Sequence, residues 1–421
     1  MDLLIAFVIT LAIITAVSLW YRISPFFTLV GGAILFGLLA GMTLEATLEG
    51  IVSGLGKVFA SFGLIILCGA VIAILLQDQL QAEEIVSDIR RIVKHPPALA
   101  GFSGYLLSVP ITCCVTAYVM LQPILECLET DKAKRNILLY LAAVGSIISY
   151  ALIFPTPVVI PLFSAFSAGT SALVYDAIAI PLSLIVLAGA LFFYRWARMD
   201  ISWSGSPLPS CVPQETSQGI HWRAWAPFIA ILVAIPVSFF LLGLSHVGII
   251  NFIMLVGAVT AIALAPGGVR ALGLTKSAKH AGMIIFDICG AGALGYVIVK
   301  SGFTEGVLGQ LVFLIPVILV PFILAAVIET AQGSRVVTAV ITAEVLGGSA
   351  VVGAIHPIPL ILLISAGSCI VSYVTDPFFW LVQRTTGDDI NTVVKNYTLP
   401  IALAGIAILI VAVGLQYLVF G

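Results

Sequence analysis

Long apolar stretches, separated by short polar segments, make up most of this chain. In the first half they cover residues 3–20, 26–42, 50–77, 97–129, 136–162 and 172–194. In the second half they cover residues 226–243, 249–265, 276–299, 313–347, 358–382 and 397–419. About 20 consecutive apolar residues suffice for a helix to cross the hydrocarbon core of a bilayer. The pattern therefore predicts an all-α integral membrane protein whose two halves repeat the same order of spans.

Two of the longest apolar stretches are interrupted in the middle. Pro110 lies within 97–129, and Gly333 begins a Gly-Ser pair within 313–347. Proline and glycine both disfavour a continuous helix. We therefore expect each stretch to form a re-entrant hairpin, which enters and leaves the membrane on the same side.

A second kind of interruption predicts one broken helix in each half. The stretch 136–162 is broken around residues 154–157, and the stretch 358–382 is broken at Asp376-Pro377. Irregular backbone at membrane depth is tolerated only where it is buried in protein or lines a cavity. We therefore expect these discontinuous helices to meet the hairpin tips near the midplane of the membrane.

The two halves also share sequence landmarks at a nearly constant spacing. The matched pairs are Ser149-Tyr150 with Ser372-Tyr373 (372 − 149 = 223), Gly69-Ala70 with Gly292-Ala293 (292 − 69 = 223) and Val115-Thr116-Ala117 with Val337-Thr338-Ala339 (337 − 115 = 222). A hydrophobic chain that repeats itself once, with broken helices at matching places, is typical of a secondary transporter.

Basic residues predict the orientation of the two halves. If 97–129 is a hairpin, the basic residues before and after it lie on one side of the membrane: Arg90, Arg91, Lys94, Lys132, Lys134 and Arg135. An excess of Lys and Arg marks the cytoplasmic side. Each half then crosses the membrane five times, and this odd number places the second half upside down relative to the first. We predict a first inverted repeat at 1–194, a cytoplasmic linker at 195–224 and a second inverted repeat at 225–421. The protein would lie in the cell (inner) membrane, with both termini on its outer side.

Composition supports the membrane class and excludes others. Hydrophobic residues make up 61% of the chain and charged residues 9%, against about 25% charged in ordinary soluble domains. The net charge of −2 gives no basis for a nucleic-acid partner, so the expected surroundings are the lipid bilayer. The seven cysteines form no CxxC pair, and we expect neither a disulfide framework nor a metal or other cofactor.

Four half-helices are predicted to begin near the midplane. They follow Pro110, Pro157, Gly333 and Pro377. Each helix start presents unpaired backbone N–H groups and the positive end of a dipole. Four such ends converging on one place favour an anionic substrate.

Side chains near these breaks agree with an anion site. Arg335 follows the second hairpin tip, and its guanidinium matches a carboxylate in a bidentate way; pairing with Glu329 inside the hairpin is the alternative. Polar and backbone groups that would surround a hydroxylated substrate are Thr112, Ser149, Thr156, Gln332, Gly333, Ser334, Thr338, Ser372 and Thr375. Hydroxyl groups of this kind can instead cap their own helices.

Acidic residues within the spans are candidates for ion coupling. Asp376 directly precedes Pro377 in a broken helix, and Glu329 lies just before the second hairpin tip. A carboxylate at either place could carry a proton or ligate sodium, so the coupling ion is H⁺ or Na⁺. Capping of the following half-helix is the alternative role for Asp376. Asp287 faces no recognisable partner in the sequence and is interpreted as structural.

Three segments resemble the gluconate permease family of the ion transporter superfamily. They are Pro25 to Glu49, the run Ala331-Gln332-Gly333-Ser334, and Ala366 to Val382. The resemblance implies uptake of small hydroxy-carboxylates or related acids, typically with protons. It also implies inverted repeats with hairpins, a homodimer, and an elevator-type movement of a transport domain against a scaffold.

The chain departs from the family pattern at three places. Where the family carries an Asp after the first hairpin tip, this chain has Thr112-Cys113-Cys114. The family carries a His-rich run where this chain has residues 149–157. The family also carries an Arg before the AQGS run, whereas this chain has Glu329 in that region and an Arg after the run, at 335. These changes favour a smaller or less polar carboxylate, or a sulfonate, over a sugar acid.

The leading hypothesis is therefore a symporter of a small organic anion. A sodium/proton antiporter of the same architecture is the alternative, and it would need carboxylates but no Arg-lined pocket. A membrane-embedded enzyme is disfavoured because no HExxH, GxSxG or paired-Asp motif lies on any span. A passive channel stays open as a further alternative.

Overall fold

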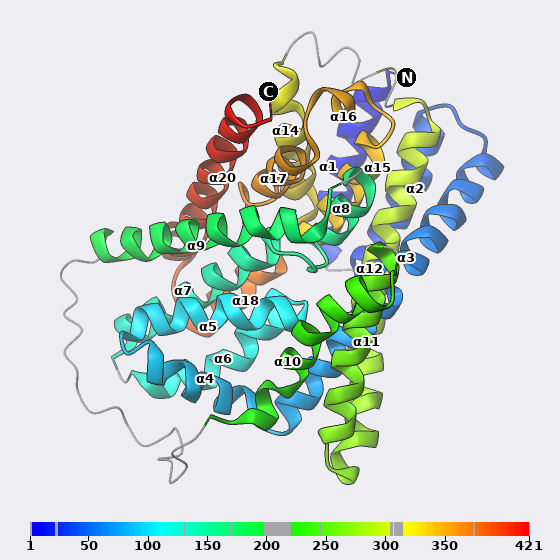
Figure 1. The fold of residues 1–421 in the computed structure, drawn as a ribbon. Coiled ribbons are helices and arrows are strands. Elements are labelled where there is room, and N and C mark those ends of the chain that lie inside the picture. The colour runs from blue at the N-terminus through cyan, green and yellow to red at the C-terminus, as the bar shows by residue number, and fades with distance from the viewer. Residues whose placement is uncertain are drawn as a thin grey trace.

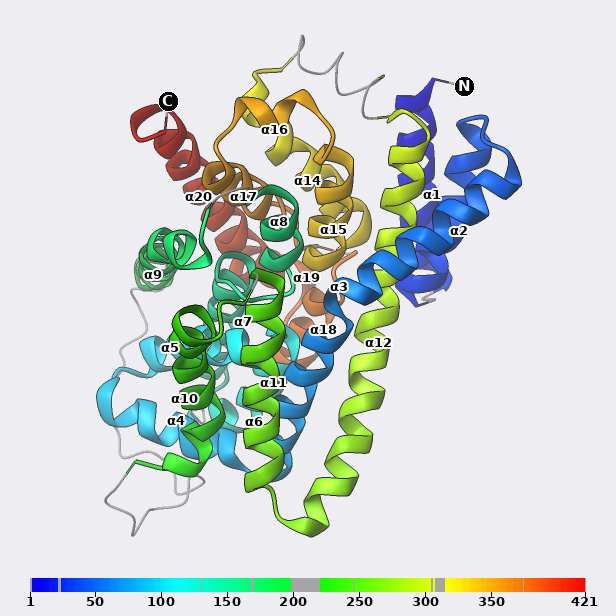
Figure 2. The same cartoon turned by 45° about the vertical axis from the view of Figure 1, so that its right-hand side comes forward.

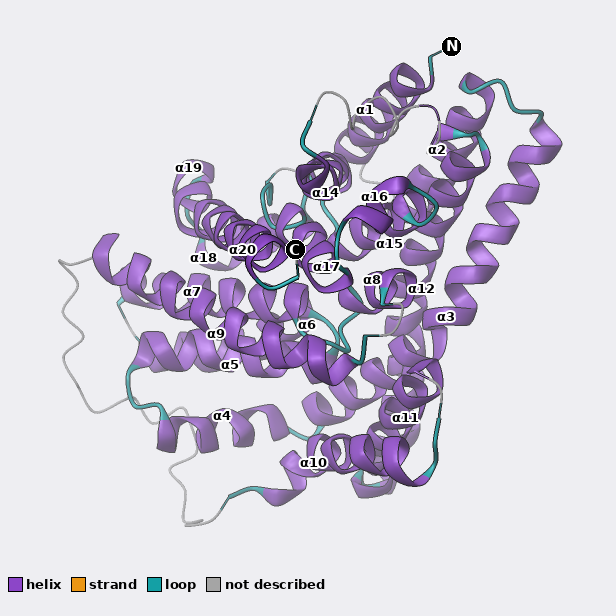
Figure 3. Ribbon diagram, turned by 45° about the horizontal axis from the view of Figure 1, so that its top comes forward, coloured by secondary structure: helices purple, strands orange, loops and turns teal. Residues whose placement is uncertain are grey.

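A computed structural model describes residues 2–21, 24–129, 131–167, 170–197, 220–244, 246–303, 306, 315–373 and 375–420. Within these ranges all regular structure is helical and no strand occurs (Figure 3). The fold is therefore all-α, as the apolar stretches predict.

The helices of the first half follow the predicted spans closely. They are α1 (Leu3–Tyr21), α2 (Pro25–Leu39), α3 (Leu44–Asp78), α4 (Gln81–Ile92), α5 (Pro96–Ile111), α6 (Cys114–Leu128), α7 (Lys132–Leu152), α8 (Val159–Phe166) and α9 (Ala172–Ala197). The stretch 97–129 is divided into α5 and α6, and the stretch 136–162 is divided into α7 and α8. Of the predicted linker, residues 198–219 lie outside the described residues.

The second half presents a similar order. Its elements are α10 (Trp222–Pro236), η1 (Val237–Leu241), α11 (His246–Leu264), α12 (Gly267–Lys300), η3 (Val317–Leu319), α14 (Val320–Gln332), α15 (Arg335–Leu346), α16 (Ala350–Ala354), α17 (Pro357–Gly367), α18 (Pro377–Thr386), α19 (Ile390–Val393), η4 (Val394–Thr398) and α20 (Leu399–Leu418). Residues 313 and 314 of the predicted second hairpin lie outside the described residues. Both chain ends lie at the same side of the molecule (Figures 1 and 2).

Long apolar helices agree with a multi-pass membrane protein. Within the described residues, five helical stretches are long and apolar enough to cross a membrane: 44–78, 132–152, 172–196, 267–300 and 390–418. Shorter apolar helices, including α1, α2, α10 and α11, accompany them. Large apolar side chains are exposed on several of these helices, as expected for surfaces that face lipid.

The longest helices, α3 and α12, have 35 and 34 residues and pack along each other (Figure 2). Glycines allow their backbones to approach closely. A Cβ atom added at Gly54 would lie 2.3 Å from the carbonyl oxygen of Gly292. Replacement of either glycine would therefore push apart the two helices on which much of the fold is built.

The breaks within the helices differ in detail from the prediction. Pro110 lies inside α5, and the chain breaks two residues later at Thr112, which has a left-handed φ of 55°. The corresponding residue between α14 and α15 is Gly333, with φ 62°. In each pair the two helices pack against one another. In the second broken helix the gap begins after Gly367, well before the predicted position at Asp376.

The charged stretch before the first hairpin forms the amphipathic helix α4, and its Asp88 is buried. The Asp88 carboxylate accepts hydrogen bonds from the backbone N and Nδ1 of His221, both at 3.0 Å, and from Nε1 of Trp225 at 2.9 Å. Burial alone would raise the pKa of Asp88, but these donors together lower the pKa below its usual value. Asp88 therefore ties α4 to the start of α10.

Candidate functional site

The tip between α14 and α15 is a tight turn pressed against the second broken helix. The left-handed conformation of Gly333 reverses the chain, and a Cβ added there would lie 2.2 Å from the backbone of Thr375. Ser334 then caps α15, because its Oγ accepts from the N–H of Val337 at 3.5 Å. Only glycine fits this close approach.

Arg335 is the first residue of α15 and points into the protein. Its side chain is 4% exposed, and Nη1 lies 3.5 Å from Oδ2 of Asp376, whose side chain is 3% exposed. Nη2 of Arg335 donates to Oγ of Ser372. An intramembrane charge is costly and must be paired, so the tip and the broken helix are held together by one buried ion pair.

Asp376 performs two tasks at once. Its Oδ1 accepts from the N–H of Phe378 at 2.8 Å and so caps α18, while Oδ2 accepts from the hydroxyl of Tyr397 at 3.2 Å. The predicted alternative of helix capping is therefore correct, and the same carboxylate also faces Arg335. The partner carboxylate of Arg335 is thus Asp376, in place of the Glu329 pairing considered from the sequence.

Glu329 is fully buried in the last turns of α14. Its Oε2 accepts from Oγ1 of Thr338 at 2.7 Å, so it joins the two helices of the hairpin. Its Oε1 has no hydrogen-bond partner among the described residues. We use the term charged cluster for Glu329, Arg335, Thr338, Ser372, Asp376 and Tyr397.

Several polar atoms around this cluster are left without partners. Within the described part of the chain these are Nε of Arg335, Nε2 of Gln332 and Oε1 of Glu329, and also Oγ1 of Thr156 in the first broken helix. A buried polar group without a partner costs about 1–3 kcal/mol. Two free donors and one free acceptor at one tip therefore indicate a place where a ligand, an ion or water completes the hydrogen bonding.

The tip between α5 and α6 has a similar backbone but no charge. Thr112 takes the left-handed position, and Sγ of Cys113 accepts from the N–H of Thr116 at 3.4 Å. Cys114 and Tyr150 lie close enough to Arg335 for an electrostatic interaction. The first broken helix also approaches α15, since Pro157 and Val336 line the same narrow space of about 10 Å³. The two tips are therefore neighbours.

Three further residues considered from the sequence, Ser149, Thr375 and Asp287, make hydrogen bonds within the protein. Oγ of Ser149 donates to carbonyl oxygens within its own helix, α7, and Oγ1 of Thr375 donates to the carbonyl oxygen of Thr330 at 3.0 Å. These two hydroxyls are satisfied by backbone, as the capping alternative anticipates. Asp287 accepts from Ser24 and from the N–H of Phe26, both at 3.1 Å, and so holds the start of α2.

Tyr397 belongs to the cluster but was not predicted from the sequence. It is fully buried on η4 and contacts Asp376 from 21 residues further along the chain. The only signal was a polar Asn-Tyr-Thr run at 396–398, at the start of an apolar span. A polar run in that place can mark a membrane boundary as readily as a site.

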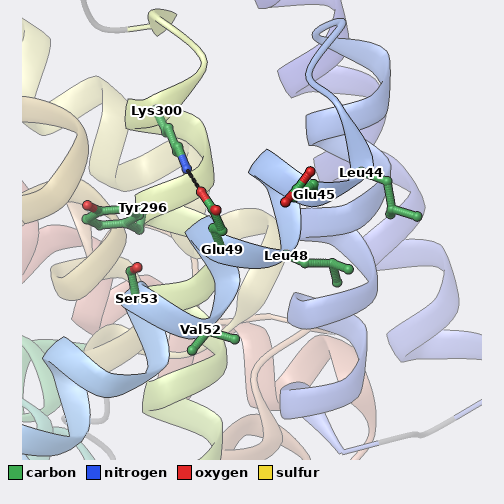
Figure 4. A pocket seen from close by; sticks show the side chains of 8 residues that line it. All are labelled: Leu44, Glu45, Leu48, Glu49, Val52, Ser53, Tyr296 and Lys300. Atoms are coloured by element: carbon green, nitrogen blue, oxygen red, sulfur yellow. Dashed lines mark hydrogen bonds and ion pairs between the residues drawn. The ribbon is translucent and has the colours of Figure 1, made fainter.

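A large hollow lies elsewhere (Figure 4). It is an open groove of about 810 Å³ between the start of α3 and the end of α12, where Nζ of Lys300 lies 3.1 Å from Oε2 of Glu49. Its walls carry exposed apolar side chains such as Leu44 and Val52. Its charged groups Glu45, Glu49 and Lys300 are exposed, so the groove lacks the buried, partnerless groups that distinguish the charged cluster.

Comparison with known families decides the class of protein. The family model described as GntP family permease matches residues 1–204 and 224–419. The chain belongs to the GntP permease family. The family expected from the sequence is therefore confirmed, and the chain is a permease rather than an enzyme.

Named relatives of this GntP family member extend over nearly the whole chain. It is 25% identical to the gluconate permease of Zymomonas mobilis, over 99% of this chain and 98% of that protein. It is 24% identical to a high-affinity gluconate transporter of Escherichia coli, over 90% of this chain and 91% of that protein. The solved structure of the YdaH transporter of Alcanivorax borkumensis has a similar fold, with a TM-score of 0.63, 14% identity, and 89% of each chain covered.

Proposed function

We propose that this GntP family protein is a secondary transporter that moves a small organic anion across the membrane by ion-coupled symport. The observation that carries the proposal is the buried guanidinium of Arg335, which has one donor, Nε, without a partner among the described residues. Relatives named as gluconate permeases and transporters support the substrate class.

The anion would bind where positive groups already converge. Nε of Arg335 and Nε2 of Gln332 are free donors at one tip, and α15 and α18 both begin beside them. Helix starts add the positive end of a dipole. A carboxylate or sulfonate could accept from both side chains without displacing the Asp376 ion pair, since that pair uses Nη1 of Arg335.

The first tip argues against a highly hydroxylated substrate. Cys114 at this tip and Tyr150 on α7 lie close enough to Arg335 for an electrostatic interaction, and the adjoining narrow space is lined partly by Pro157, Ile160 and Val336. A thiol and apolar groups offer few hydrogen bonds to substrate hydroxyl groups, and Tyr150 adds a single hydroxyl. We propose a carboxylate or sulfonate that is smaller or less polar than a sugar acid.

Charge balance supports coupling to a cation. With Glu329 ionised, the cluster of Arg335, Asp376 and Glu329 carries one net negative charge before any anion arrives. A second buried negative charge would be costly in a dry site. A proton on Glu329, or a sodium ion at its free Oε1, would remove this cost, so binding of anion and cation would favour each other.

The architecture that supports alternating access is an inverted repeat. We propose that α5/α6 and α14/α15 are re-entrant hairpins, that residues 1–194 and 225–421 are the two repeats, and that the linker is cytoplasmic with both termini outside. The shared side of the two chain ends agrees with this topology (Figure 1). An elevator-type movement of the hairpins against α3 and α12, in a homodimer, completes the proposal.

Uptake into liposomes that contain the purified protein tests the proposal. Labelled gluconate, smaller hydroxy acids and short sulfonates are compared under an inward proton gradient, an inward sodium gradient and no gradient. We expect accumulation of at least one anion, driven by one of the two ions. The absence of uptake or binding for every anion would contradict the proposal.

An arginine variant separates symport from the antiporter alternative. Arg335→Met should abolish anion uptake because it removes both the charge and the free donor. Arg384→Met, at an exposed arginine, is the matched control and should retain uptake. If Arg335→Met retained sodium/proton exchange while the wild type moved no anion, the antiporter would be favoured.

A further inference from the structure

The two long helices occupy matching places in the two halves. α3 begins at Leu44 and α12 at Gly267 (267 − 44 = 223), and they end at Asp78 and Lys300 (300 − 78 = 222). Ion pairs between opposite ends, Lys300 with Glu49 and Lys276 with Asp78, show that the helices run antiparallel. An antiparallel pair of matching helices is what an inverted repeat requires.

Lys57 and His280 hold the same position in this pair (280 − 57 = 223). Nζ of Lys57 lies 2.8 Å from Oε1 of Glu344 on α15. Nε2 of His280 lies 3.3 Å from Oγ1 of Thr116 on α6. Each long helix therefore offers one polar side chain to the second helix of the hairpin that belongs to the other half.

The two contacts are made at different heights on the hairpins. Measured from the left-handed tip residues Thr112 and Gly333, Thr116 is four residues past its tip (116 − 112 = 4) and Glu344 is eleven past its tip (344 − 333 = 11). The difference of seven residues is two helical turns on the same face, or roughly 10 Å. The hairpins are therefore placed off centre along α3 and α12.

A second observation gives the direction in which the hairpins are displaced along α3 and α12. A Cβ added at Gly69 would lie 2.0 Å from Oγ1 of Thr112, so the first tip packs on this end of α3. At the matching glycine, Gly292, the nearest atoms to an added Cβ belong to Val58 and Gly54 of α3 rather than to a hairpin tip. Val336 shares its narrow space with Phe62, Ile65 and Ile66 of α3 and with Ile288 of α12, whereas Glu344 lies beside Gly295. Both tips thus lie toward the Asp78 end of α3.

We propose that Lys57 and His280 are paired positioning residues that exchange partners when the hairpins move during transport. The inference rests on the proposed function, since it uses moving hairpins in inverted repeats. Because the two halves have the same fold, each half can adopt the conformation that the other half has here. In this exchanged state, each hairpin takes the position along its long helix that the other hairpin has in the present structure. Counted from the tip residues Thr112 and Gly333 (333 − 112 = 221), one less than the spacing of the sequence landmarks, Lys57 then faces Val337 (116 + 221 = 337) and His280 faces Pro123 (344 − 221 = 123).

The strength of the contacts suits repeated breakage. The side chain of Lys57 is 57% exposed and that of Glu344 is 17% exposed, so the pair is not sealed inside the protein, and a long lysine side chain can turn its charged end toward the membrane surface when its partner moves away. Such a pair biases the position of the hairpin without locking it. With the Asp78 end of α3 at the cytoplasmic side, as the basic residues predict, the present structure is the inward-facing state.

Cysteine cross-linking in the full-length protein tests the exchange. Lys57→Cys/Glu344→Cys should form a cross-link in the state seen here. Lys57→Cys/Val337→Cys should form one only in the exchanged state. Lys57→Cys/Thr330→Cys, on α14, is the control that should link in neither state, and single variants control for the native cysteines. Cross-linked peptides are identified by mass spectrometry after oxidation in liposomes.

The outcomes separate this inference from the proposed function. A protein that takes up anion but links only positions 57 and 344 would overturn the exchange of partners. A protein that links both pairs but moves no anion would contradict the proposed function alone, because cross-linking needs no substrate.

A population measurement excludes a merely structural role. Glu344→Gln weakens the contact of the present state only, so it should raise the yield of the His280→Cys/Pro123→Cys cross-link two- to fivefold. Glu126→Gln, a carboxylate that accepts from Gln122 within α6, is the matched control and should leave the yield unchanged. An unchanged yield in Glu344→Gln would contradict the positioning role.

Discussion

The two hairpin tips share a backbone conformation but differ in chemistry. Each places one residue in the left-handed region, Thr112 in the first tip and Gly333 in the second, and each begins its next helix with a side-chain cap. The second tip adds the buried Arg335 and Glu329 and faces the buried Asp376 of the broken helix, whereas the first adds two thiols. A common fold therefore supplies the positions, and only one half supplies the charge.

Under the proposed function, this difference gives the tips separate tasks. Positive charge and free donors at the second tip would bind the acidic group of the substrate. The uncharged first tip would contact the rest of the substrate and contribute mainly shape. If the division is correct, substitutions at the second tip should have larger effects than the equivalent changes at the first.

The largest effect is expected from the buried ion pair. Arg335→Met or Asp376→Asn alone leaves one buried charge without its partner, which typically costs about 3–5 kcal/mol. The double variant Arg335→Met/Asp376→Asn removes both charges and should regain most of this stability, yet it should transport no anion. Thermal unfolding in detergent and uptake in liposomes measure the two effects. A double variant as unstable as the singles would show that the pair does not act as a unit.

A smaller effect is expected from the left-handed residues. Gly333→Ala places a methyl group about 2.2 Å from the backbone of Thr375 and should destabilise the protein by about 1–3 kcal/mol. Thr112→Gly removes the strain of a non-glycine residue at positive φ and should stabilise by up to about 1 kcal/mol. Opposite signs in thermal unfolding are the expected result. Equal destabilisation by both would mean that the Thr112 side chain contributes more than its backbone strain costs.

The sequence predicts the helical spans well because long apolar stretches identify them without any tertiary information. The ends are less predictable. α3 begins at Leu44 rather than 50 because Thr43 caps it, accepting from the N–H of Ala46 at 3.2 Å, and α12 begins at Gly267, well before the apolar part of the span. Both helices therefore begin ahead of the predicted apolar segment and end within one residue of it.

Part of the candidate site could be predicted, and part depends on contacts between distant residues. A glycine-serine pair followed by arginine indicates a break and a charge, so Gly333, Ser334 and Arg335 stand out in the sequence. Thr112 does not, because nothing in its residue type favours positive φ. The burial of Asp88 depends on donors more than 130 residues away, which no local pattern reveals.

A carboxylate substitution examines whether coupling belongs to the second tip. Glu329→Gln keeps an acceptor for Thr338 but cannot carry a proton. We expect anion exchange to persist while gradient-driven accumulation falls about tenfold, which corresponds to about 1.4 kcal/mol of lost coupling. Glu126→Gln, in the first hairpin, should retain accumulation. Loss of accumulation in Glu126→Gln alone would move the coupling site to the first hairpin.

The smallest effect is expected from exchanging the two capping residues. Cys113 caps α6 through a sulfur that accepts at 3.4 Å, and Ser334 caps α15 through an oxygen that accepts at 3.5 Å. Oxygen is the stronger acceptor, so Cys113→Ser should stabilise by roughly 0.5 kcal/mol and Ser334→Cys should destabilise by about 1 kcal/mol. If both tips serve only as helix starts, neither change should alter substrate affinity. Because Ser334 lies beside the free donors of Gln332 and Arg335, Ser334→Cys should also weaken anion binding several-fold, whereas Cys113→Ser should not. Unfolding and binding measured on the same two variants therefore separate the shared backbone role from the charge that only the second tip carries.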